Sequence, residues 1–194
     1  MESEIRKLFW LLHEEVLYLF YRWRIYQQLF GSGEENLDLL NRSGSNVFHL
    51  LQVLTEDNVY LTLSRLTDPE KSTGRDNLSL TYLLKKLEPT LSAELQKHLR
   101  EGLDTLKEKT QSIRDHRNRR IAHLDLSYAK KVELLSAVDQ DELDDTLGLL
   151  ESTMRELHRV ISDADTRYKD PAIAYGCDGD HLLGVLRDAY QPRV

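Results

Sequence analysis

Apolar residues recur at steps of three and four along most of the chain, which is the period of a helix with one buried face. The clearest example extends from Ser3 to Phe30, and Gly31 marks its end. A loop-like segment rich in glycine and serine follows, up to Asn46. A second amphipathic stretch extends from about Val47 to Leu66. It stops at Thr67-Asp68-Pro69, because the residue before a proline disfavours helical backbone.

The second half of the chain predicts three more helices and a shorter terminal one. A surface loop over residues 70–77 precedes a short helix, which Asn77 or Ser79 caps and Glu88-Pro89 ends. The next helix starts near Leu91 and lacks proline, so we expect it to run unbroken into residues 114–125.

A long amphipathic helix is expected from Asp139 to Tyr168, with an acidic beginning that suits a helix N-terminus. Its inward residues are Leu143, Leu147, Leu150, Met154, Leu157 and Ile161. After Asp170-Pro171 the pattern predicts only a short, weakly capped helix. The expected architecture is therefore an antiparallel helical bundle over residues 1–168 with a helical extension over residues 169–194.

Composition supports an all-α fold and restricts the chemistry. The 194 residues carry a net charge of -7, 40% are hydrophobic, and only four are proline. Cys177 is the single cysteine, so neither an internal disulfide nor a CxxC metal site can form, and we expect no metal and no cofactor. The first residues contain no apolar run suited to a signal peptide or a membrane span, which predicts a cytoplasmic protein with no membrane partner.

The segment RDHRNRRIAHLD, residues 114–125, concentrates four arginines and two histidines in an otherwise acidic chain. Arg117 continues the inward face of the preceding helix, and Ile121 and Leu124 follow it on that face. The earlier members of the face are Leu99, Leu103, Leu106, Thr110 and Ile113. A guanidinium at a core-facing position keeps its charge and therefore needs a partner.

Two interpretations of Arg117 fit the sequence. In the first, Arg117 forms a buried or half-buried ion pair with a carboxylate on another helix, for example Asp57 or Glu14, while the other arginines of the segment are solvated near the helix C-terminus. In the second, Arg117 lines a cleft and binds a phosphodiester bidentately. His123 suits proton transfer near neutral pH, but a regular helix would place it roughly 120° from Arg117. The two would converge only if the helix loosens after Ile121 or if two chains form the site.

Other residues gave weaker signals. Arg65 is expected to cap the end of its helix by pairing with Asp68, or else to be a second phosphate contact. His116 and His123 lack further ligands at suitable spacing and make a poor metal site. The first helix also has a second apolar side, which a second subunit would cover. Its residues are Trp10, Tyr18, Tyr21 and Ile25.

The stretch RNRRIAH, from Arg117 to His123, resembles the arginine–polar–histidine signature of the HEPN superfamily. Together with FHLLQVLTEDNVYLTLSRLTDP and NLSLTYLLKKL, it resembles the branch related to the abortive-infection AbiU-type proteins, over roughly residues 20 to 165. The resemblance implies a helical bundle, often a homodimer, that cleaves RNA without a metal. In that reading Arg117 stabilises phosphate charge, Asn118 orients the substrate or the histidine, and His123 is the general base or acid.

The remaining residues of the segment complete the predicted site. Its other basic residues are expected to bind RNA, and three more residues to support the site. The first set is Arg114, His116, Arg119 and Arg120, and the second is Arg65, Asp125 and Tyr128. Asp125 occupies a place where many nuclease members have an aromatic residue; it would either hold the ring of His123 or repel RNA.

The predicted function is a metal-independent endoribonuclease of the toxin or phage-defence kind. Its expected partners are RNA, a second copy of the chain through the first helix or the segment 114–125, and an antitoxin or regulatory protein. The alternative is a non-catalytic interaction or scaffold module in which Arg117 forms a structural salt bridge.

Overall fold

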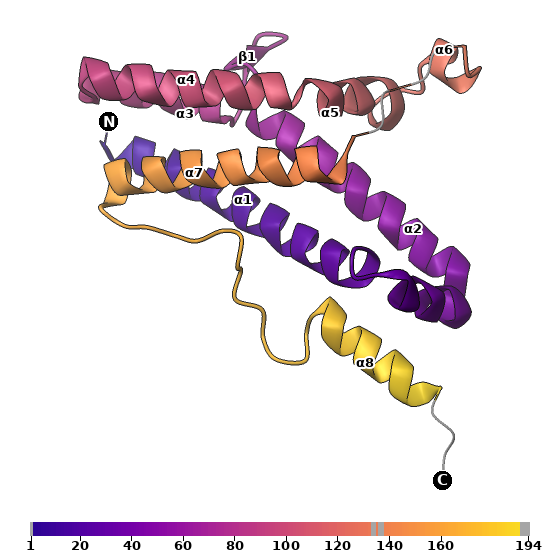
Figure 1. The fold of residues 1–194 in the computed structure, drawn as a ribbon. Coiled ribbons are helices and arrows are strands. Elements are labelled where there is room, and N and C mark those ends of the chain that lie inside the picture. The colour runs from indigo at the N-terminus through magenta and orange to yellow at the C-terminus, as the bar shows by residue number, and fades with distance from the viewer. Residues whose placement is uncertain (1, 133–134, 136–137, 191–194) are drawn as a thin grey trace. The chain divides into compact units, whose positions relative to one another are not determined.

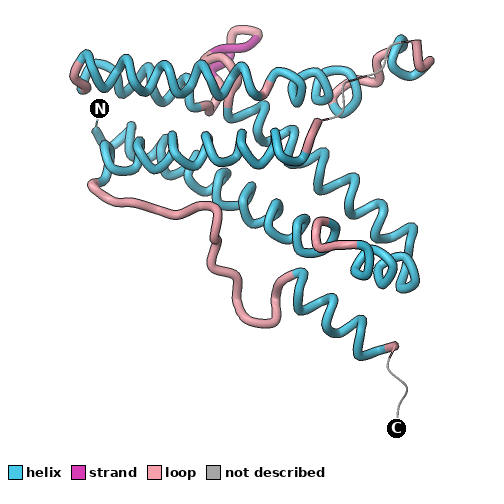
Figure 2. The backbone as a smooth tube through the Cα atoms, in the orientation of Figure 1, coloured by secondary structure: helices cyan, strands magenta, loops and turns pink. Residues whose placement is uncertain are grey.

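The computed structural model describes residues 2–132, 135 and 138–190, and over these residues the protein is all-α (Figure 1). The helices are α1 (Glu2–Phe30), α2 (Glu34–Leu66), α3 (Leu80–Leu87), α4 (Ala93–Lys109), α5 (Gln111–His116), α6 (Leu126–Ala129), α7 (Gln140–Ser162) and α8 (Gly179–Ala189). A two-stranded hairpin, β1 (Lys71–Ser72) and β2 (Arg75–Asp76), follows α2. Figure 2 shows helix in most of the tube, and a long loop between α7 and α8. None of the described helices is long and apolar enough to span a membrane.

The chain forms two compact units, and α1 and α2 each contribute to both. The first unit comprises Met1–Val16 and Tyr60–Tyr168, and the second comprises Leu17–Val59 and Lys169–Val194. In the sequence-based division, residues 169–194 were an extension of a bundle over residues 1–168. That division stays a prediction, although the residues after Tyr168 group with Leu17–Val59.

In the first unit, α4 packs against α7 and α3. The inward face predicted for α7 is confirmed, because all six of its residues are at most 8% exposed. On α4 and α5 the residues Leu99, Leu103, Leu106 and Ile113 are likewise buried. Ser79 caps α3 as expected, since its hydroxyl accepts the Tyr82 backbone N–H.

In the second unit, α8 is held by both apolar and polar contacts. Leu183 of α8 joins Leu29, Leu39 and Leu40 in one core cluster. Gln28 accepts a hydrogen bond from the Gly179 N–H at 3.0 Å and donates to Asp178 at 2.9 Å and Asp180 at 2.8 Å.

The expectation of a weakly capped terminal helix was wrong. Asp178 accepts the His181 N–H at the start of α8, and this bond together with Gln28 lowers the pKa of the Asp178 carboxyl. The N-terminus of α8 is therefore capped by its own side chain and by a side chain from α1.

Two more predicted boundaries were wrong, and one surface loop contains more regular structure than expected. The segment after Gly31 is not a loop, because α2 begins at Glu34 and is interrupted only at Gly44, where the backbone is extended. The surface loop before α3 contains the hairpin β1–β2. The helix expected to reach Tyr168 ends at Ser162, because Asp163 adopts a left-handed conformation (φ 51°) and closes it.

Candidate active site

The segment 114–125 is not the end of one unbroken helix. Helix α4 ends at Lys109, and Thr110 leaves the helical conformation with φ −88° and ψ 6°. Its hydroxyl bonds to the Lys107 carbonyl at 3.0 Å and lies 3.3 Å from the Thr67 hydroxyl. A threonine hydroxyl that bonds locally in this way competes with regular helix geometry. Because the Arg114 N–H still bonds the Thr110 carbonyl, α5 follows α4 directly.

After α5 the helix widens and then ends before His123. Residues Arg117–Ile121 form one turn of π-helix, in which the Ala122 N–H bonds the Arg117 carbonyl at 2.8 Å. The Asp125 N–H then bonds the Arg119 carbonyl at 3.0 Å. These two bonds tie the residues on both sides of His123 to the backbone of Arg117 and Arg119. His123 itself is exposed, in non-helical chain. The helix thus loosens from Arg117 onward, earlier than the loosening after Ile121 considered from the sequence.

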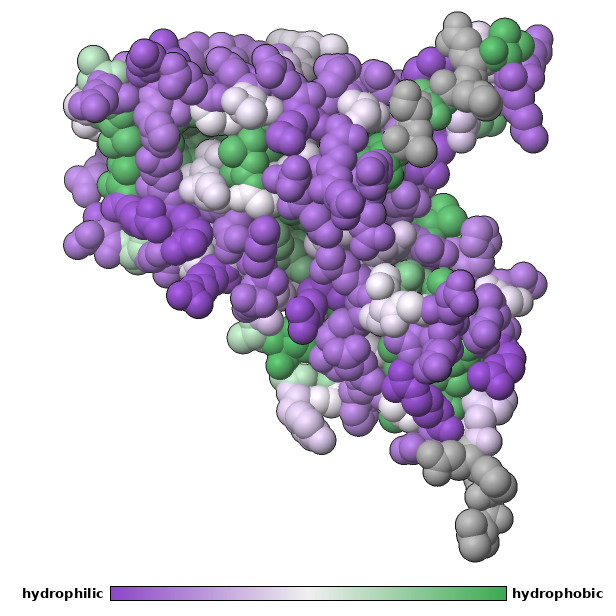
Figure 3. Space-filling model, in the orientation of Figure 1, coloured by the Kyte–Doolittle hydropathy of each residue, from purple (hydrophilic) through white to green (hydrophobic). Residues whose placement is uncertain are grey.

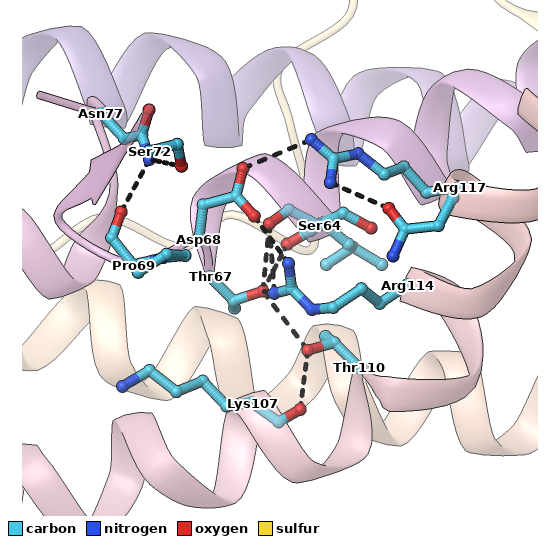
Figure 4. Close-up of polar contacts among 12 residues, drawn as sticks. Ser64, Thr67, Asp68, Pro69, Ser72, Asn77, Lys107, Thr110, Arg114 and Arg117 are labelled. Atoms are coloured by element: carbon cyan, nitrogen blue, oxygen red, sulfur yellow. Dashed lines mark hydrogen bonds and ion pairs between the residues drawn. The ribbon is translucent and has the colours of Figure 1, made fainter. Parts of the chain in front are cut away.

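Arg114 is anchored inside the protein, although the first interpretation had it solvated. Its guanidinium bonds Asp68 at 2.6 Å, the Thr67 hydroxyl at 2.8 Å and the Ser64 carbonyl at 3.4 Å (Figure 4). The Arg114 side chain is 19% exposed and that of Asp68 only 14%. This is a partly buried, charge-assisted contact between α5 and the chain just after α2.

The guanidinium of Arg117 has fewer hydrogen-bond partners than that of Arg114. Its guanidinium faces the Asp68 carboxylate (Figure 4), with Nη2 3.6 Å from the nearer oxygen. Its Nη1 donates to the Asn118 side chain at 3.1 Å. Its Nε is buried and has no hydrogen-bond partner among the described residues. The side chain is 28% exposed. The ion-pair partner is therefore Asp68, and not Asp57 or Glu14 as the first interpretation expected.

The side chain of Asp125 forms hydrogen bonds within the segment and at the start of α6. Its carboxylate accepts the Tyr128 N–H at 2.9 Å and an Arg119 guanidinium N–H at 3.2 Å. These contacts, the Tyr128 bond first, lower the pKa of the Asp125 carboxyl. Asp125 is thus the N-cap of α6. Its contacts go to Tyr128 and Arg119, so the expectation that it holds the His123 ring is not met.

The other basic residues of the segment have different surroundings. Arg120 lies over the ring of the buried Tyr60, with its Cζ 6.0 Å from the ring centre, and the His116 ring lies 5.6 Å from the same ring. Arg65 lies 3.8 Å from Glu15, so it does not pair with Asp68 as expected. Leu124, expected to face inward, is 76% exposed.

Asp68 and Thr67 are the site residues that sequence reasoning did not identify as such. Both lie directly after α2, in the Thr-Asp-Pro stretch that the sequence marked as a helix stop, with Asp68 expected to pair with Arg65. The available signal was the concentration of arginines over residues 114–120, since partly buried arginines require carboxylates.

The arrangement combines one fixed and one under-satisfied arginine with an exposed histidine in the next turn of chain. Such a set can bind a phosphate and move a proton, which are the two requirements of phosphodiester cleavage through a 2′-hydroxyl. Among the described residues, no group of three or more His, Cys, Asp or Glu side chains is placed to hold a metal ion.

An all-α fold with an arginine–asparagine–histidine element where a helix ends defines a protein of the HEPN class. The chain matches the family described as AbiU2 (HEPN_AbiU2) over residues 2–182, and it therefore belongs to this family. HEPN domains in general are associated with RNA and form dimers. No curated protein and no solved structure matches the chain.

Proposed function

We propose that this protein is a metal-independent endoribonuclease that cuts RNA by attack of a 2′-hydroxyl on the adjacent phosphate. The observation that carries the proposal is the incomplete pairing of the Arg117 guanidinium. Its ion pair with Asp68 is long, its Nε lacks a partner among the described residues, and its side chain is partly exposed. Family membership supports an activity on RNA.

The proposed reaction uses two residues directly. His123 takes the proton of the 2′-hydroxyl, the 2′-oxygen forms a bond to phosphorus, and the bond to the 5′-oxygen breaks as that oxygen gains a proton. The products are a 2′,3′-cyclic phosphate and a 5′-hydroxyl. Arg117 binds a non-bridging oxygen and stabilises the charge that develops there. Asn118 keeps the guanidinium of Arg117 oriented through the 3.1 Å bond.

The surrounding cations are proposed to bind the RNA backbone in unequal measure. Arg119 and Arg120 lie within the π-helical turn and supply positive charge next to the site. Arg114 is the weakest candidate, because its donors already engage three acceptors inside the protein. We therefore assign Arg114 a structural contribution within this proposal.

The proposed active form is a homodimer whose interface includes the segment with His123. Leu124 is 76% exposed and Leu126 is 65% exposed, so two apolar side chains are exposed directly after His123. If Arg117 of one chain acts with His123 of the other, a mixture of Arg117→Ala and His123→Ala proteins regains activity. Such a mixture stays inactive if both residues act within one chain.

The direct test is incubation of the purified protein with labelled RNA in EDTA, followed by analysis of fragment ends. Wild type is expected to produce 2′,3′-cyclic phosphate ends, while Arg117→Ala and His123→Ala lose about 10²-fold to 10⁴-fold in rate. Arg75→Ala and His49→Ala are matched controls, because they remove the same side chains from exposed positions outside the site. Equal fragmentation by all five proteins would mean a contaminating nuclease and would remove the proposal.

The biological setting we propose is that of a toxin or phage-defence component, kept inactive by an antitoxin or regulatory protein. The family to which the chain belongs supports it. Growth arrest of cells on induction of wild type, and its absence with His123→Ala, would agree with it.

A second candidate, a non-catalytic interaction module, is favoured by one observation. Asp68 faces both Arg114 and Arg117, which is the pairing expected of a purely structural arginine cluster. In that case Arg117→Ala lowers the stability of the fold, and no RNA end carries a cyclic phosphate.

A further inference from the structure

Asp68 is a carboxylate set between two arginines of the candidate site. It lies directly after α2, and its side chain is 14% exposed (Figure 4). One oxygen, Oδ1, is 2.6 Å from Arg114, and the other, Oδ2, is 3.6 Å from Arg117. A single negative charge therefore faces two positive ones.

The two contacts of Asp68 are unequal. Arg114 is at hydrogen-bond distance and is also held by the Thr67 hydroxyl and the Ser64 carbonyl. Arg117 is beyond hydrogen-bond distance and keeps an Nε without a partner among the described residues. Arg114 is therefore the permanent partner of Asp68, and Arg117 is the exchangeable one.

We propose that Asp68 stands in for the substrate phosphate: it holds Arg117 in the free protein and gives it up when a phosphodiester arrives. This proposal rests on the proposed function, because it concerns the same site. Release costs little, since Arg114 continues to neutralise Asp68 after Arg117 has moved. The phosphate also offers acceptor oxygens at true hydrogen-bond distance, which Asp68 does not offer to Arg117.

The negative charge of Asp68 should therefore compete with RNA through Arg117. Asp68→Asn removes the charge and keeps an oxygen that accepts from Arg114. In the His123→Ala background, where RNA is bound but not cut, we expect Asp68→Asn to bind a short labelled RNA about threefold to fivefold more tightly, the size expected of a partly exposed ion pair.

Two comparisons separate this effect from a general change in charge. Asp115→Asn removes the same charge from an exposed carboxylate of α5 and should change affinity by less than about 1.5-fold, because salt screens exposed charges. Asp68→Asn combined with Arg117→Met should gain no more than Asp115→Asn does. A gain that persists without Arg117, no gain at all, or a loss of affinity would each overturn the proposal.

A measurement on the wild-type chain keeps the proposal testable if Asp68→Asn does not fold. The side-chain Nε–H signal of Arg117, identified by its loss in Arg117→Lys, is followed by NMR during titration of the wild-type chain with inorganic phosphate and of His123→Ala with RNA. It should shift, while the Arg114 signal stays in place. A fixed Arg117 signal, or an equal shift of both, would refute the exchange. Because no arm requires cleavage, loss of the catalytic proposal alone would leave this one standing.

Discussion

The two arginines that face Asp68 should differ sharply in their effect on stability. We compare Arg114→Met with Arg117→Met, because methionine keeps much of the aliphatic stem and removes only the charged, hydrogen-bonding end. Arg114 is expected to be a structural residue and Arg117 a functional one. Arg114→Met should therefore destabilise the protein far more than Arg117→Met.

The magnitudes follow from the contacts. Breaking a buried ion pair by removing one partner costs roughly 3 to 5 kcal/mol. The Arg114 and Asp68 side chains retain 19% and 14% exposure, so solvent reduces the expected cost to about 2 to 3 kcal/mol. The pair of Arg117 with Asp68 spans 3.6 Å and leaves the side chain 28% exposed, so its loss should cost less than about 1 kcal/mol.

The assay is urea unfolding followed by circular dichroism, supported by thermal melting. A gap of roughly 2 kcal/mol corresponds to a difference of about 4 to 8 °C in melting temperature for a chain of this size. If Arg117→Met destabilises the protein as much as Arg114→Met, then Arg117 is a structural residue, and the reasoning that assigns it to the substrate fails.

Three more predictions concern other parts of the chain. Burial lowers the pKa of both His13 and His158 below 6.5, so the unfolded state binds more protons as pH falls through that value. Stability should thus be full above pH ~6.5 and decline below it, by up to ~1.4 kcal/mol per pH unit for each histidine; equal urea midpoints at pH 7.5 and 5.5 would contradict this. Gly179→Ala should destabilise the protein by about 1 to 3 kcal/mol, because its Cβ would lie 2.9 Å from the Gln28 Cβ. At Gly184 an added Cβ would have no atom within 4 Å, so Gly184→Ala should add up to about 1 kcal/mol of stability. The melting temperatures of the two variants should therefore shift in opposite directions from that of the wild type.

The sequence predicted the regular parts of the fold well, because there a single helix face decides the burial. Each inward residue predicted for α7 is buried, and Ser79 caps α3. The early part of α2 was missed because its glycines and serines indicate a loop, whereas Leu39 and Leu40 are fixed by a core that includes Leu183, far away in the chain. Tertiary contacts of this kind override local propensity.

The candidate site was predicted in part. The repeat of the inward face located Arg117 as an arginine in need of a partner, and the structure gives it only a loose one. The partner itself, Asp68, lies in another segment, and no spacing rule connects the two. Two further features could not be predicted from the sequence. The break at Thr110 involves a contact with the Thr67 hydroxyl, and the π-helical turn depends on backbone hydrogen bonds donated by residues after Ile121.

The most direct test of the central claim uses a DNA oligonucleotide that contains a single ribonucleotide, incubated with the protein in EDTA. We predict one cut, immediately after the ribonucleotide, with a 2′,3′-cyclic phosphate end and with loss of the cut in His123→Ala. A cut elsewhere in the DNA, a 3′-hydroxyl end, or an undiminished cut by His123→Ala would contradict an endoribonuclease built on Arg117 and His123.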